Sequence, residues 1–177
     1  MRLVSKMDAG PILLQKKIAI GAGMTASELH AALAAEGAAL IIETLRGLRD
    51  GSVRETAQDE SRASFAPSLK KEHGRIDWSR PGIEILRQVR AFDPWPGSFA
   101  RTTRGLLKVH KAAFHEHLPG APDDAAPGDL FLGAGSFLVR CGSGWIELLN
   151  VQPENGNSME SRSYLNGIRN DHGFNLL

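Results

Sequence analysis

SRPGIEILRQVRAFDPWPGSFART, residues 79–102, contains a helix pattern, a stop signal and a strand candidate in succession. Leu86, Val89 and Phe92 recur at helical spacing and therefore share one face. Proline is tolerated in a first helical turn, so we expect a helix that begins at Ser79 and ends before the two prolines of DPWPG. The segment GSFART that follows is the first strand candidate.

Four more strand candidates follow at short intervals: LLKVHKAAF, GDLFLGA, SFLVRC and WIELLNV. Turn-forming segments rich in glycine and proline separate them. Five short strands at this spacing are typical of a small barrel or sandwich. With a last short helix in SMESRSYLNG, they predict a complete β domain over residues 78–177.

The N-terminal part has a different pattern. Residues 2–5 and 11–20 are predicted as two short strands around a turn at Asp8. A T-x-x-E capping box at Thr25 and a leucine-rich helical stripe predict a helix over 25–49. Two strands and one helix cannot bury that stripe, and an exposed stripe is adhesive, so self-association through this helix is a possible outcome.

Composition limits the class of protein. The chain has 177 residues with 42% hydrophobic and 23% charged residues, which is ordinary for a globular protein. Its single cysteine excludes an internal disulfide framework and a cysteine-rich zinc site. No apolar run approaches the roughly 20 residues of a membrane span, and the start has no secretory signal pattern. These features predict a cytoplasmic protein with no membrane partner.

Charge is unevenly distributed along the chain. Residues 61–111 have eleven lysines and arginines against four acidic residues, a net charge of +7. The flanking segments 1–60 and 112–177 have net charges of −1 and −5. Such a basic block indicates a polyanionic partner, although basic residues also decorate the solvated faces of ordinary elements. Part of the block lies in residues 52–77, whose weak apolar periodicity predicts a solvated linker.

Six strings match one family: KMDAGPILLQ, MTASELHAALAAEGAALIIETL, AQDESRASFAPSLKKEHGRIDWSRP, QVRAFDPWPGSF, PGDLF and LLNVQPENGNSM. The most specific parts are RIDWSRP and RAFDPWPG, with the QDE…AP…K-E run upstream of them. On these residues the chain resembles the C-terminal half of methionyl-tRNA formyltransferase, over nearly its whole length.

The resemblance implies an α+β fold with three parts. Residues 1–51 would be the remnant of a Rossmann-like formyltransferase domain, 52–77 a linker, and 78–177 an OB-like β barrel. It also implies the family's activity in translation initiation and one-carbon metabolism. That activity transfers a formyl group from 10-formyltetrahydrofolate to the amino group of methionine on initiator tRNA.

The resemblance implies one catalytic residue in this chain. The family's catalytic set is an asparagine, a histidine in H-x-S-L-L-P and an aspartate in D-x-G, and only Asp8 with Gly10 matches. The attacking amine must lose a proton and the tetrahedral oxyanion needs donors, so a lone carboxylate is insufficient. We therefore expect a truncated chain, inactive alone, that does not bind the folate donor by itself.

The family's linker and barrel bind tRNA, and the basic block covers both. Lys71 matches the lysine of the family's K-E pair. The candidate tRNA-binding residues are Arg62, Lys70, Lys71, Arg75, Arg80, Arg87 and Arg90. Trp78, Trp95 and Phe99 are candidates for base stacking, although a core or interface plug is the stronger interpretation of Trp95.

Two departures from the family pattern reduce the expected affinity for tRNA. Asp93 stands where the family usually has asparagine before P-W-P, which adds a negative charge. Asn155-Gly156-Asn157 stands where the family usually has G-K-K or G-K-R, which removes two cations. The interaction with initiator tRNA is therefore expected to be weak.

Alternatives from other classes remain open. His115 and His117 are two residues apart, so a strand would place both on one face as metal ligands. A formyltransferase relative acting on a sugar nucleotide or small amine has loosely similar strings. A folate-binding fragment or a non-catalytic RNA-binding module is also consistent with the sequence.

Overall fold

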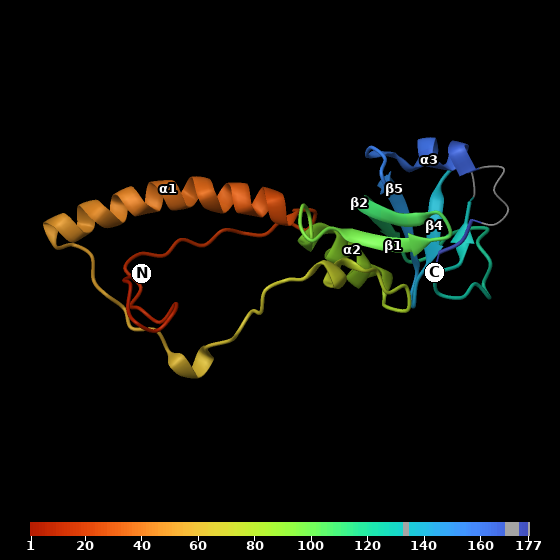
Figure 1. Ribbon diagram of the computed structural model, residues 1–177. Helices are drawn as coiled ribbons and strands as arrows, with labels where there is room; N and C mark the ends of the chain where they lie inside the picture. Colours follow the sequence, from red (N-terminus) through yellow and green to blue (C-terminus); the bar gives the residue numbers. More distant parts are fainter. Residues whose placement is uncertain (133–134, 169–173, 177) are drawn as a thin grey trace. The chain divides into compact units, whose positions relative to one another are not determined.

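The structure is a computed structural model that describes residues 1–132, 135–168 and 174–176. The chain divides into two compact units, Met1–Ser68 and Leu69–Leu177, which we call unit 1 and unit 2 (Figure 1).

Unit 1 is built on the helix α1, Ala26–Asp50. Thr25 Oγ1 accepts from the backbone N–H of Glu28, and the Glu28 carboxylate accepts from the Thr25 backbone N–H at 2.8 Å. This confirms the predicted capping box, which satisfies backbone donors that have no partner within the helix. Gly51 ends the helix with a left-handed φ of 73°, a conformation that glycine adopts without strain.

The apolar stripe of α1 is not covered. Leu33, Ile41, Ile42, Leu45 and Leu48 are all exposed. Among the described helices, α1 included, none is both long enough and apolar enough to cross a membrane.

The prediction of strands over residues 2–5 and 11–20 is wrong. These residues form no strand, and their one sheet-type contact within residues 1–68 is an isolated bridge between Ile12 and Thr56. The Ile12 and Thr56 amides donate to each other's carbonyl at 2.8 and 2.9 Å. An apolar run indicates a need for burial, but a strand also needs neighbours along its length to satisfy its backbone groups. Unit 1 also contains the 3-10 helix η1, Glu60–Arg62.

Unit 2 begins with the 3-10 helix η2, Lys71–Gly74, and the α-helix α2, Gly82–Ala91. The predicted start of α2 at Ser79 is three residues too early. The Asp77 carboxylate accepts from the Ser79 backbone N–H at 3.0 Å and from Ser79 Oγ at 2.6 Å. Proline disfavours the helical conformation of the residue before it, and Pro81 itself has an extended ψ of 135°, so the helix begins only after Pro81.

A six-stranded, antiparallel and curled sheet forms the body of unit 2 (Figure 1). Its strands are β1 (Ser98–Thr102), β2 (Gly105–His115), β3 (Leu130–Phe131), β4 (Phe137–Arg140), β5 (Trp145–Pro153) and β6 (Met159–Glu160). They lie in the order β1-β2-β5-β4-β3, with β6 paired to β5. All five strand candidates form strands, although the last two residues of GDLFLGA lie outside the described part. The strand β6 is not among the predicted strands.

The core of unit 2 lies between the sheet and the helices. Ile85 and Val89 of α2 pack with sheet residues such as Leu107 and Ile146. The helix α3, Ser161–Ile168, adds three hydrophobic side chains to this core, including Tyr164. Cys141 lies in the same core, and burial raises the pKa of its thiol to about 12, so the thiol is protonated and unreactive at neutral pH.

Candidate nucleic-acid interface

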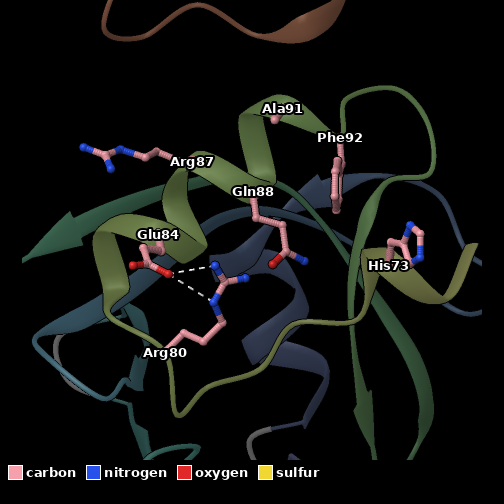
Figure 2. A pocket seen from close by; sticks show the side chains of 7 residues that line it. All are labelled: His73, Arg80, Glu84, Arg87, Gln88, Ala91 and Phe92. Atoms are coloured by element: carbon pink, nitrogen blue, oxygen red, sulfur yellow. Dashed lines mark hydrogen bonds and ion pairs between the residues drawn. The ribbon is translucent and has the colours of Figure 1, made fainter. Parts of the chain in front are cut away.

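A surface pocket of about 330 Å³ lies between η2 and α2 in unit 2. Its lining residues are His73, Arg80, Glu84, Arg87, Gln88, Ala91 and Phe92 (Figure 2). Most of them lie on one face of α2 because they are three or four residues apart, the spacing that brings helical side chains together. The helix thus presents a polar face with Glu84, Arg87 and Gln88 to solvent and an apolar face to the core.

Arg80 and Glu84 form an ion pair at the start of α2. Arg80 donates from Nε and Nη2 to Glu84 Oε2 at 3.1 and 2.7 Å (Figure 2). Both side chains are about half exposed, and such exposed pairs are worth about 0–1 kcal/mol. An incoming anion can therefore compete with Glu84 for the Arg80 guanidinium.

His73 and Gln88 fix the wall of the pocket. The Lys70 backbone N–H donates to His73 Nδ1 at 3.2 Å, so His73 Nε2 is left as the ring's donor to a ligand. Gln88 Nε2 is 3.3 Å from the carbonyl oxygens of both Gly74 and Arg75. The end of η2 is therefore bonded directly to the middle of α2.

Asp77 is a carboxylate within the basic segment. Hydrogen bonds from the Ser79 hydroxyl and backbone lower the pKa of Asp77, and the nearby Arg80 and Arg75 lower it further. Asp77 is therefore ionised at neutral pH and offsets part of the local positive charge.

The predicted tRNA-binding residues fall in both units. Six of them lie in unit 2, from the N-cap of η2 to the last turn of α2: Lys70, Lys71, Arg75, Arg80, Arg87 and Arg90. Arg87 is exposed, and its guanidinium extends away from Arg80 and His73 (Figure 2). Arg90 is half-buried. Arg62 lies in unit 1, in η1, so the site described here consists of unit 2 residues alone.

The aromatic candidates differ in exposure. Trp78 is only 8% exposed and belongs to the core, so it cannot stack on a base. Phe99 is half-buried beside Gly74. Trp95 is 59% exposed, which contradicts its interpretation as a plug in the core of unit 2.

The two departures from the family pattern lie in turns. Asp93 is half-buried after α2. Asn155 has a left-handed φ of 61° in a turn closed by the Gly156 N–H, which donates to the Pro153 carbonyl at 3.0 Å. Asparagine tolerates this conformation better than most residues, which gives Asn155 a structural role.

Asp8 lies in a turn of unit 1 that Gln58 clamps. Gln58 Nε2 donates to the backbone carbonyls of Asp8 and Gly10 at 2.8 and 2.7 Å. Asp8 is exposed with a left-handed φ of 54°. A Cβ at Gly10 would lie 1.8 Å from the Arg2 carbonyl oxygen, so only glycine fits there. Gln58 is not among the residues predicted to be functional, although it stands in the QDE string.

The metal alternative has no geometric support. His115 is the last residue of β2, so the strand alternation does not extend to His117. His115 Nε2 instead bonds Glu147 Oε2 on β5 at 2.9 Å. Among residues 1–132, 135–168 and 174–176, no group of three His, Cys, Asp or Glu side chains could hold a metal ion.

Comparison with known families agrees with this architecture. The family described as Formyl transferase, C-terminal domain, matches residues 68–169. The methionyl-tRNA formyltransferase of Acidobacterium capsulatum is 38% identical over 168 residues, which cover 94% of this chain and 53% of that protein. The chain thus spans about half the length of the curated relatives it matches.

Solved structures show the same fold at low identity. A variant of HypX from Aquifex aeolicus has a TM-score of 0.69 and 18% identity, covering 95% of this chain and 30% of HypX. An N-formyltransferase from Helicobacter canadensis, in complex with folinic acid and dTDP-3-aminofucose, has a TM-score of 0.61 and 18% identity. This match covers 82% of the present chain and 52% of the Helicobacter chain.

Proposed function

Because this chain belongs to the family of formyl transferase C-terminal domains, we propose that it holds the tRNA substrate in formylation of methionyl-initiator tRNA. The observation that supports this proposal most is the cationic surface between η2 and α2, in a chain whose relatives are named methionyl-tRNA formyltransferase. Arginine and lysine contacts to phosphate position a nucleic acid without reading its sequence. The surface therefore serves substrate placement rather than selection.

The two units would take different parts in this function. Unit 2, with its curled sheet, is proposed as the family's OB-like barrel. Residues 1–51 are proposed as the end of a larger Rossmann-like catalytic domain, which would cover the exposed stripe of α1. In that domain Asp8 would orient and charge-stabilise the catalytic histidine while the methionyl amine attacks the formyl carbon.

This chain alone is proposed to be inactive. Its sequence contains no H-x-S-L-L-P segment, so the proton acceptor that Asp8 would orient is absent. Incubation with 10-formyltetrahydrofolate and charged initiator tRNA should give no formylmethionyl-tRNA above the rate without protein. Formylation that depends on Asp8 would contradict this assignment.

The surroundings of Asp8 do not fit the folate donor. Asp8 lies exposed on its turn, whereas a donor site must enclose much of its ligand. This chain alone is therefore not expected to bind the donor.

Binding of deacylated initiator tRNA to the chain should weaken steeply as salt is raised. Each phosphate engaged contributes a slope of about −0.7 to −0.9 in log affinity against log salt concentration. Changing Lys70, Lys71 and Arg75 together to alanine should reduce the magnitude of that slope by about two to three, because three phosphate contacts are lost. Filter binding over a range of salt concentrations measures both quantities.

A matched control separates local contact from net charge. Changing Lys17, Arg46 and Arg49 to alanine removes the same charge from unit 1 and should leave the slope nearly unchanged. An equal effect of the two triple variants, or binding without salt dependence, would contradict a phosphate-binding role for η2.

The alternative function acts on a sugar nucleotide or small amine. The Helicobacter structure shares the fold with this chain, and it is a complex with the sugar nucleotide dTDP-3-aminofucose. The names of the relatives at 34–40% identity favour tRNA. A competition assay distinguishes tRNA from a sugar nucleotide as the substrate. Stoichiometric displacement of tRNA by thymidine diphosphate at low concentration would favour the sugar nucleotide.

A further inference from the structure

Trp95 is the exposed tryptophan of the chain. It is 59% exposed, whereas Trp78 and Trp145 are 8% and 4% exposed and lie in the core of unit 2. The chain contains three tryptophans in all, and each is described. A tryptophan buries more apolar surface than most residues when it is covered, so its exposure here is a feature to explain.

The loop that presents Trp95 is held in place on both sides. Pro94 and Pro96 flank the tryptophan and fix their own φ angles. The Gly97 N–H donates to the Phe92 carbonyl at 2.9 Å, which closes the loop at the C-terminal end of α2. Gly97 also packs so closely on Gly74 that a Cβ at position 74 would lie 2.0 Å from the Gly97 carbonyl oxygen.

Trp95 follows closely in the chain a residue of the pocket between η2 and α2. Phe92 lines this pocket together with Arg80 and Arg87, and it is three residues from Trp95. The two Cα atoms are therefore no more than about 11 Å apart. Among the described residues of unit 2, the other large exposed apolar side chains are Leu69, Ile83 and Leu132. A rigid aromatic beside cations is the arrangement that binds single-stranded nucleic acid, because bases stack on the ring while cations bind phosphates.

We propose that Trp95 stacks on an unpaired base of the bound RNA while the neighbouring cations hold its phosphates. This inference rests on the proposed tRNA-binding function and names the part of the substrate involved, a single-stranded segment. Loop rigidity makes the contact favourable because little side-chain and backbone freedom is lost on binding.

The test uses the whole chain, a short single-stranded oligoadenylate and a blunt RNA duplex of equal length. Because the other two tryptophans are buried, acrylamide quenching reports mainly on Trp95. The single strand should quench emission and protect it from acrylamide, and the duplex should do neither. Trp95→Ala should weaken single-strand binding by about tenfold or more, and Trp95→Phe by less.

Salt dependence separates stacking from phosphate binding. Trp95→Ala should lower the affinity at every salt concentration and leave the slope unchanged, because it removes no charge. Leu132→Ala is the matched control, since it removes another exposed apolar side chain and should change neither affinity nor quenching.

Three results would overturn the inference, and they have different meanings. If RNA bound in a salt-sensitive way but acrylamide still quenched Trp95 emission fully, stacking would be rejected. The proposed function would remain intact. Protection of Trp95 by raising the protein concentration without RNA would identify a second copy as the occupant. Absence of any RNA binding would reject both the inference and the proposed function.

Discussion

Phe137→Ala should lower the free energy of unfolding of unit 2 by about 3–5 kcal/mol, the cost of deleting a buried phenylalanine ring. Phe137 lies on β4 and is completely buried. Its ring stacks on Tyr164 at 6.2 Å between centroids and meets the Phe174 ring edge-on at 6.0 Å. The deletion would leave a cavity between the sheet and α3. Urea titration followed by tryptophan emission measures the change, because unfolding exposes the buried Trp78 and Trp145.

Phe65→Ala is the matched control for this experiment. It is the same chemical change at a side chain that is 97% exposed, so it should alter stability by less than about 0.5 kcal/mol. Phe137→Leu should restore part of the loss because it refills much of the cavity without an aromatic ring. Equal effects of Phe137→Ala and Phe65→Ala would show that the three-ring cluster does not stabilise unit 2.

The sheet of unit 2 was predictable because its signals are local. Strands such as β2 and β5 are long enough for their apolar pattern to show, and glycine-rich turns mark their ends. The strand β6 has only two residues, Met159 and Glu160, which is too short for any periodicity. It exists because β5 offers a free edge at Asn150 and Val151, and that information is not local.

The prediction of two N-terminal strands was wrong because strand formation there depends on non-local pairing. The run ILLQKKIAI has apolar residues at both ends, and this pattern indicates only that these side chains favour burial. Whether it becomes a strand depends on a neighbouring strand, and in unit 1 the neighbour of Ile12 is Thr56 alone. A pattern in one segment cannot specify its partner.

In the candidate site, too, the local features could be predicted from the sequence and the contacts between separate elements could not. The cations of the basic block were visible in the sequence, and six of them lie within residues 70–90, which contain η2 and nearly all of α2. The contribution of His73, the pairing of Arg80 with Glu84 and the exposure of Trp95 depend on how η2, α2 and the DPWPG loop pack together. Spacing along the chain predicts neighbours within one helix but not contacts between separate elements.

Gly74→Ala should destabilise unit 2 by about 3 kcal/mol, at the upper end of the usual range for overpacking. The new Cβ would lie 2.0 Å from the Gly97 carbonyl oxygen and 3.3 Å from Phe99 Cδ1. A backbone atom cannot move aside as a flexible side chain can, so residues 74 and 97 would have to separate. The Ile76 N–H bond to the Phe99 carbonyl, 2.8 Å long, lies directly beside this contact and would be strained as well.

Gly167→Ala is the control, and it should raise the free energy of unfolding, whereas Gly74→Ala should lower it. Gly167 lies in α3, and among the described residues outside its own helix no heavy atom lies within 4 Å of the position that its Cβ would occupy. Alanine should therefore stabilise the helix by up to about 1 kcal/mol. Because Gly74 joins η2 to the loop of Trp95, Gly74→Ala should also weaken tRNA binding under conditions in which the protein remains folded. If Gly74→Ala and Gly167→Ala unfolded at the same urea concentration, the close packing of η2 on the DPWPG loop would not stabilise the site.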